Sequence, residues 1–146
     1  MSIEHAKKEH FAEITAVWKD SVRATHHFLT EADIEALRPQ IRDEYLPAVD
    51  LRIYKEPSGA ILGFIGVGGQ KIEMLFIASA ARGKGIGKSL VRYAIEEMDA
   101  AEVDVNEQNP KARGFYEHMG FEVFSRSPLD ARGRPFPILH MRLAAR

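Results

Sequence analysis

Apolar residues recur every three or four positions along two stretches in the first third of the chain. In the first stretch, residues 11–22, the apolar positions on one helical face are Phe11, Ile14, Val17, Trp18 and Val22. The second stretch, residues 30–45, starts with a Thr-x-x-Asp segment that resembles a capping box, and helical periodicity follows it. Pro39 lies inside this second stretch, where its missing N–H should kink or split the helix. The pattern predicts two amphipathic helices after a weakly signalled strand at residues 3–6.

From residue 51 the pattern changes to short apolar runs separated by glycine and proline turns. These runs predict strands at residues 51–55, 60–67, 72–77, 102–105, 121–126 and 138–143. Helical periodicity returns at residues 90–98, and a further helix is predicted to begin at Asn109-Pro110 and to end at Gly120. The order of elements, βααβββαβαββ, indicates an α+β (mixed α/β) fold with one sheet. At 146 residues, the chain is expected to form a single domain, residues 1–146.

Composition excludes several classes of function. The net charge of −1 gives no electrostatic reason to expect nucleic acid or an anionic membrane as a partner. The sequence has no cysteine, which excludes disulfides, thiolate metal sites and a cysteine nucleophile. The start of the chain lacks the apolar region of a signal peptide, and no apolar run reaches the roughly 18–20 residues of a membrane span. We therefore expect a soluble, cytoplasmic protein.

The segment Arg82-Gly83-Lys84-Gly85-Ile86-Gly87 lies between an apolar run and an amphipathic helix. Alternating glycines remove side chains from a turn and leave a row of backbone N–H groups accessible. The helix that follows directs the positive end of its dipole at the same place. Together these features predict a site for a phosphate or pyrophosphate, although a tight strand-to-helix turn without a ligand has the same local pattern.

Two common nucleotide-binding motifs do not fit this loop. The P-loop, G-x-x-x-x-G-K-S/T, would need a glycine where the chain has Arg82, and the dinucleotide motif G-x-G-x-x-G would need one at Lys88 or Leu90. The pattern R-x-x-G-x-G does fit, through Arg82, Gly85 and Gly87. In this respect the chain resembles the GCN5-related N-acetyltransferase (GNAT) superfamily, whose pyrophosphate loop reads R/Q-x-x-G-x-G/A.

A second segment carries the same resemblance. Residues 109–121, NPKARGFYEHMGF, are similar to the superfamily pattern N-x-x-A-x-x-F-Y-x-x-x-G-F, and the order of elements agrees along nearly the whole chain. The resemblance implies a GNAT fold, a single central mixed but mostly antiparallel sheet with splayed middle strands and flanking helices. One departure is Ser79, which stands where the superfamily often has a proline before the loop.

The resemblance implies an N-acetyltransferase that takes acetyl-CoA as cosubstrate, with the amine attacking the thioester directly. The loop would hold the pyrophosphate, and the end of the strand before it would hydrogen-bond the pantetheine arm and polarise the thioester carbonyl. The implied CoA-binding residues are Leu75, Phe76, Ile77, Arg82, Gly83, Lys84, Gly85, Ile86, Gly87, Lys88 and Asn109. Two of these assignments have structural alternatives. Residues 75–77 also suit a sheet core, and Asn109 also suits a helix N-cap.

Tyr116 is the expected general acid, because a phenol with a pKa of about 10 stays protonated at neutral pH. The alternative is a Tyr packed on the last hairpin with its hydroxyl bonded to backbone. Glu73 is the candidate general base, since strand alternation should place it on the same face as Leu75; a solvated Glu is the alternative. No metal is expected.

The acceptor side is expected to involve the first two helices and the last hairpin. Residues 21–29, SVRATHHFL, and 105–109, VNEQN, resemble the small bacterial branch of the superfamily typified by YjaB. His26 and Phe28 are candidate acceptor-pocket residues, and His26, Glu73 or water could be the base; a capped or solvated helix end is the alternative. The loop at residues 130–135 suits either a lid or an ordinary turn.

The expected acceptor is the primary amine of a small molecule. A protein or peptide amine is one alternative, and a non-catalytic acyl-CoA sensor is another. The resemblance also allows a homodimer.

Overall fold

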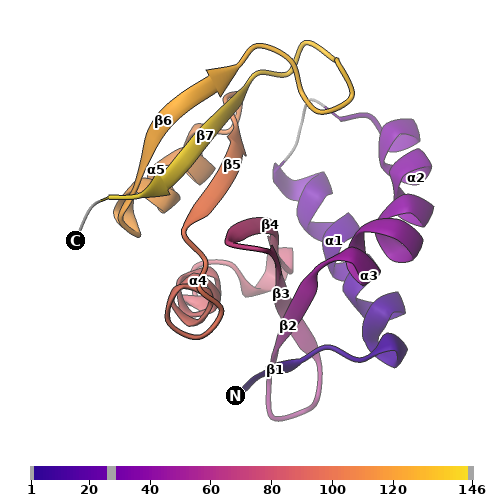
Figure 1. The fold of residues 1–146 in the computed structure, drawn as a ribbon. Coiled ribbons are helices and arrows are strands. Elements are labelled where there is room, and N and C mark those ends of the chain that lie inside the picture. Colours follow the sequence, from indigo (N-terminus) through magenta and orange to yellow (C-terminus); the bar gives the residue numbers. More distant parts are fainter. Residues whose placement is uncertain (1, 26–28, 145–146) are drawn as a thin grey trace.

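The computed structural model describes residues 2–25 and 29–144, in which seven strands form one sheet (Figure 1). The strands are β1 (Ser2–His5), β2 (Asp50–Lys55), β3 (Ile61–Gly68), β4 (Lys71–Ile77), β5 (Glu102–Asn106), β6 (Phe121–Ser127) and β7 (Ile138–Leu143). Their order across the sheet is β1-β2-β3-β4-β5-β7-β6. Neighbouring strands are antiparallel except for the parallel pair β4–β5. This is the mixed, mostly antiparallel sheet that the resemblance implied.

Helices cover the two faces of the sheet in separate groups. The α-helices are α1 (Phe11–Thr25), α2 (Glu31–Gln40), α3 (Leu46–Ala48), α4 (Ile86–Glu97) and α5 (Pro110–His118). One apolar core joins α1, α2 and the segment after it to β2, β3 and β4. The other joins α4 and α5 to the strands from β3 to β7. The helices of the second core carry the two motifs, so the glycine loop and Tyr116 are positioned from the same side of the sheet.

The second predicted helix changes type near its proline. The Thr30 hydroxyl accepts a hydrogen bond from Asp33 N at 3.1 Å, and the Asp33 carboxylate accepts one from Thr30 N at 3.0 Å, which confirms the capping box. Pro39 lies in the last turn of α2. The chain then continues as a π-helical segment, Ile41–Tyr45, and as α3. Because proline lacks an N–H and crowds the preceding turn, the helix alters its geometry there instead of stopping.

A β-bulge at Glu73 opens the middle of the sheet. Val67 pairs with Ile72 and Gly66 pairs with Met74, so Glu73 is the extra residue on β4. Beyond it the pairing of β4 with β5 is lost, since these strands pair only at Lys71↔Glu102 and Ile72↔Val103. The middle strands therefore splay, as the resemblance implied.

The bulge also changes which face of the sheet the Glu73 side chain lies on. Ile72 packs into the core with α4 and α5, whereas Met74 packs into the core with α1. Regular alternation is therefore interrupted between them, and the expectation that Glu73 shares the face of Leu75 by simple alternation is wrong. The Glu73 side chain is exposed and lies over Gly68, where an added Cβ would be 3.3 Å from its Cγ.

Candidate active site

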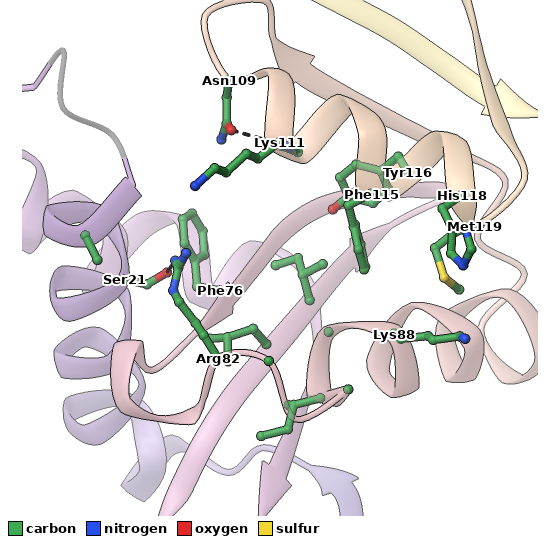
Figure 2. A pocket seen from close by; sticks show the side chains of 18 of the residues that line it. Ser21, Phe76, Arg82, Lys88, Asn109, Lys111, Phe115, Tyr116, His118 and Met119 are labelled. Carbon is green, nitrogen blue, oxygen red and sulfur yellow. Dashed lines mark hydrogen bonds between the residues drawn. The ribbon is translucent and has the colours of Figure 1, made fainter.

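A cavity of about 700 Å³ lies where the glycine loop, the end of β4 and helix α5 meet (Figure 2). We call it the larger cavity. Helix α1 contributes Ser21 and Ala24 to its wall, and β4 contributes Leu75, Phe76 and Ile77. The loop and α4 contribute Ala81, Arg82, Gly83, Gly85, Ile86, Gly87 and Lys88, and the segment around α5 contributes Gln108, Asn109, Pro110, Lys111, Ala112, Phe115, Tyr116, His118 and Met119.

The loop backbone requires glycine at two positions. Gly83 and Gly85 have φ values of +77° and +78°, in the left-handed region that other residues rarely adopt. Gly85 is the N-cap of α4, and Ser89 N donates a hydrogen bond to Gly85 O at 3.0 Å. The N–H groups of the first turn before Ser89 have no partner within the helix. This wall of the larger cavity therefore offers backbone donors and the positive end of a helix.

Helix α1 anchors the approach to the loop. The Asp20 carboxylate accepts hydrogen bonds from Ser79 N at 2.6 Å and from Ser79 Oγ at 2.9 Å. The serine that replaces the usual proline is thus held by a partner distant in sequence. Sequence reasoning did not single out Asp20, because nothing local links it to Ser79.

The larger cavity has a positive lining. Its charged residues include Arg82, Lys88 and Lys111, and none of the described residues that line it is Asp or Glu. Figure 2 shows Lys111 extending from the start of α5 toward the side that carries Phe76 and Arg82. The Arg82 guanidinium donates to Ser21 Oγ at 3.4 Å. Lys84 is exposed and does not line this cavity, unlike the other loop residues of the predicted set.

The pairing of β3 with β4 determines which backbone groups face the splay. Ala78 N donates to Leu62 O at 2.8 Å, so these two residues form a hydrogen-bonded pair. Bonded and non-bonded pairs alternate along antiparallel strands. Phe76 therefore directs its backbone groups at β3, whereas Leu75 and Ile77 direct theirs at the opposite edge, where β5 has diverged. Of the predicted residues 75–77, two offer backbone groups there.

Phe76 contributes its side chain instead. Its ring centroid lies 5.6 Å from that of Phe64, and it packs against the core with α1. Phe76 nevertheless lines the larger cavity. The packing of Phe76 confirms the expectation of a sheet core, whereas its contact with CoA stays a prediction that its place in the cavity wall allows.

Tyr116 is buried, with 6% of its surface exposed, yet Figure 2 shows its hydroxyl oxygen directed into the larger cavity. The ring makes edge contacts with Phe115 and Phe121, at centroid distances of 5.0 and 5.6 Å. Burial raises the pKa of the phenol well above its usual value of 10. Among the described residues no hydrogen-bond partner is found for this hydroxyl, in contrast to the alternative of a backbone-bonded Tyr. A neutral phenol thus faces the cavity.

Asn109 is a helix cap. Its side-chain oxygen accepts a hydrogen bond from Ala112 N at 3.1 Å, and Pro110 follows as the first helical residue. This confirms the structural alternative for Asn109. Because Asn109 also lines the larger cavity, its amide group lies at the site as well.

A second cavity of about 140 Å³, the smaller cavity, lies in the splay between β4 and β5. Its wall includes Glu73, Asp104 and Tyr116, so the structure brings the predicted base and the predicted acid to one cavity. The full lining is Ile72, Glu73, Met74, Leu75, Phe76, Val103, Asp104, Val105, Asn106, Asn109, Ala112 and Tyr116. The two cavities share Leu75, Phe76, Asn109, Ala112 and Tyr116 and therefore meet at the splay.

Asp104 is an ionisable lining residue that sequence reasoning missed. Val103 and Val105 on either side of it are buried, and that alternation on its own indicates that Asp104 faces away from the core. What the local pattern does not contain is the divergence of β4 from β5, which places this carboxylate in a cavity with Tyr116.

The acceptor-side predictions have mixed outcomes. His26 and Phe28 lie outside the described residues. The loop at residues 130–135 is a turn organised by Asp130, whose carboxylate accepts from Arg132 N at 2.9 Å and from Arg134 N at 2.8 Å. Arg132 also donates to Gln40 and to Tyr45 Oη, so the loop reaches α2 and the π-helical segment. Within residues 2–25 and 29–144, no group of three or more potential metal ligands is found.

This fold and this site define the class of protein. Residues 10–144 match the family model for the acetyltransferase (GNAT) domain, so the chain belongs to the GNAT family. GNAT acetyltransferases take their acetyl group from acetyl-CoA, and the chain is an acyltransferase. This sets aside the alternative of a non-catalytic sensor. No helix in the described part of the chain is long and apolar enough to cross a membrane.

Individual relatives support the assignment over nearly the whole chain. Peptidyl-lysine N-acetyltransferase YjaB of Salmonella typhimurium is 37% identical over 141 residues, which are 97% of each protein. The Escherichia coli protein of the same name is 36% identical over 97% of this chain and 95% of its own length. The solution structure of apo-form YjaB from Escherichia coli matches with a TM-score of 0.88 at 36% identity, covering 99% of this chain and 98% of that one.

A more distant structure matches in fold alone. The PaiA N-acetyltransferase of Thermoplasma acidophilum, in complex with coenzyme A, has a TM-score of 0.74 at 19% identity, covering 99% of this chain and 100% of that one.

Proposed function

We propose that this enzyme transfers the acetyl group of acetyl-CoA to the side-chain amine of lysine residues in proteins. The observation that carries the proposal is the 36–37% identity, over 97% of the chain, to two proteins named peptidyl-lysine N-acetyltransferases. The sequence had placed small-molecule amines first and protein amines second. The relatives favour the second alternative.

The larger cavity suits the donor. A CoA pyrophosphate needs backbone donors and positive charge, and the glycine loop, the start of α4 and the cations Arg82, Lys88 and Lys111 supply both. The pantetheine arm needs amide partners, and the outward-facing backbone groups of Leu75 and Ile77 supply them along the splay. With no acidic residue among its described lining, the larger cavity has no built-in repulsion of an anionic ligand.

Tyr116 acts as the general acid in this proposal. The acceptor nitrogen forms a bond to the thioester carbon while the carbon–sulfur bond breaks, and the departing thiolate takes the phenolic proton. An N–H of Leu75 or Ile77 donates to the carbonyl oxygen as negative charge develops on it. Burial keeps the phenol protonated through the neutral range. Because no protein partner among the described residues engages the hydroxyl, it is available to the substrate.

The general base is a carboxylate of the smaller cavity, and Glu73 is the one that the sequence singles out. It lines the smaller cavity together with Tyr116. An acceptor amine that enters there meets an acid and a base at the junction of the two cavities.

The test is an acceptor screen with matched substrates. Purified enzyme and acetyl-CoA are incubated with lysine peptides blocked at the N-terminus, with peptides that offer only a free N-terminus, and with amino acids and aminoglycosides. Thiol release gives the rate, and mass spectrometry locates the acetyl group. We expect acetylation of the lysine side chain. Turnover of small amines alone would contradict the protein-lysine proposal and restore the first expectation from sequence.

A further inference from the structure

Four polar side chains from four strands form one hydrogen-bonded network beside the smaller cavity. Asp104 on β5 bonds through Oδ1 to His140 Nδ1 on β7 at 2.7 Å. The other ring nitrogen, His140 Nε2, lies 2.7 Å from Ser127 Oγ on β6. The second oxygen of Asp104 is ion-paired with Lys71 on β4. Asp104 is thus held from both sides by groups that strand pairing places there.

The network lies on the sheet face opposite α4 and α5. Val103 and Val105 flank Asp104, Met141 follows His140, and all three belong to the core under those helices. Alternation therefore puts Asp104 and His140, which are directly opposite each other across β5 and β7, on the other face. Tyr116 reaches the smaller cavity from the helix side. The smaller cavity consequently runs through the splay, with the acid at one face and Asp104 at the other.

We propose that Asp104 is the residue that receives the acceptor ammonium and takes its proton, and that His140 and Lys71 position Asp104 and set the charge around it. This deepens the proposed function and rests on it. In the step itself, the Asp104 carboxylate first takes one proton from the ammonium and passes it to solvent, which leaves a neutral amine. The amine nitrogen then bonds to the thioester carbon while the carbon–sulfur bond breaks and Tyr116 protonates the sulfur. The new amide nitrogen gives up its second proton, which restores the Tyr116 phenol.

The local geometry favours Asp104 over Glu73 for this role. Each Asp104 oxygen has one partner in the network and keeps a further lone pair for an ammonium. The side chains of Asp104 and His140 are 30% and 26% exposed, so both are reachable but restrained. Glu73 is exposed at a bulge, and no hydrogen bond or ion pair to it is found in the described part of the chain.

Asp104→Asn tests the assignment directly. We expect kcat/KM for a lysine peptide to fall by about 100-fold, with acetyl-CoA affinity unchanged by calorimetry and the melting temperature used to verify folding. Glu102→Gln is the matched control, because it removes a carboxylate two residues away on the same strand face without touching the His140 bond. Unchanged peptide kcat/KM in Asp104→Asn, or a large loss in Glu73→Gln alone, would overturn the proposal.

His140→Gln and His140→Ala test the positioning role. Gln keeps a donor for Asp104 and should retain most of the acceptor kcat/KM, whereas Ala removes the donor at 2.7 Å and should lower the acceptor kcat/KM with acetyl-CoA affinity unchanged. Equal acceptor kcat/KM in the two variants would contradict the positioning role of His140.

A parallel assay with a simple primary alkylamine separates this inference from the proposed function. If peptides are not acetylated but the alkylamine is, and Asp104→Asn slows it, the protein-lysine substrate is wrong and the role of Asp104 stands. If peptides are acetylated and Asp104→Asn has no effect on their acetylation, the protein-lysine substrate stands and the role of Asp104 is wrong.

Discussion

The larger and smaller cavities meet at Tyr116 but are built from different parts of the chain. The larger cavity is bounded by a contiguous glycine loop and the start of one helix, with Arg82, Lys88 and Lys111 on its walls. The smaller cavity takes its carboxylates, Glu73 and Asp104, from two strands that diverge at a bulge. The larger cavity thus presents backbone donors and positive charge, whereas the smaller cavity presents acidic side chains.

This difference matches what each cavity would bind in the proposed function. A pyrophosphate is the same in every donor molecule, so a site made of backbone donors suits it. An acceptor amine is positively charged, unlike the pyrophosphate, and must lose a proton before it reacts. Removing that proton requires ionisable side chains at defined positions. We therefore expect the larger cavity to tolerate changes of its side chains but not of its glycines, and the smaller cavity to be sensitive to the loss of a single carboxylate.

The largest expected effect is that of Gly85→Val on the larger cavity. A β-branched residue at φ +78° is strained by about 1–3 kcal/mol and covers the backbone donors. We expect acetyl-CoA binding to be lost in isothermal titration. Gly133→Val is the matched control, because Gly133 has φ +76° in the β6–β7 loop and does not line the larger cavity. Normal affinity in Gly85→Val would refute the backbone-built donor site.

Tyr116→Phe tests the point where the two cavities meet. Loss of the phenolic proton should lower kcat by about 10²–10⁴-fold with acetyl-CoA affinity nearly unchanged. Tyr93→Phe serves as the control, since the Tyr93 hydroxyl contacts Arg52 at 3.4 Å and lines neither cavity. A parent-like kcat in Tyr116→Phe would remove this residue from the acid role.

The burial of Tyr116 also predicts how stability depends on pH. Its pKa is raised by burial in the folded state, so the unfolded chain loses this proton first as pH rises. The stabilising contribution is complete below the unfolded pKa of about 10 and declines above it, by about 1.4 kcal/mol per pH unit while the folded phenol stays protonated. Urea unfolding between pH 8 and pH 11 should show this fall. The fall should be smaller in Tyr116→Phe, and an equal fall in both proteins would disagree with a buried, neutral phenol.

The smallest effect separates the two roles of Asn109. Asn109→Ala should lower the free energy of unfolding by about 1 kcal/mol because the cap is lost, whereas Asn109→Ser keeps a capping oxygen and should cost little. If the amide also contacts CoA, both variants will weaken acetyl-CoA binding several-fold. If Asn109 acts only as a helix cap, the serine variant will bind acetyl-CoA normally, and the role of Asn109 is to stabilise the start of α5 beside the larger cavity.

The sequence predicts the larger cavity better than the smaller one, because the larger cavity depends on local backbone preferences and the smaller one on pairing between distant strands. The glycine pattern, the Asn109-Pro110 helix start and the Thr30 capping box depend on local backbone preferences, and the structure has each of them where the sequence indicated. The orientation of Glu73 was wrongly argued, because regular alternation holds only in an uninterrupted strand. Asp20 and Asp104 were missed because their partners, Ser79 and His140, are distant in sequence.

By itself the sequence determined the order of elements, the donor loop and the acid candidate, since φ preferences, caps and apolar periodicity act within a few residues. Only the tertiary structure decided which backbone groups of β4 face the splay, where the bulge falls, and that Lys71, Asp104, His140 and Ser127 come together. Those features arise from pairing between strands that are up to dozens of residues apart. No local pattern encodes the register in which they meet.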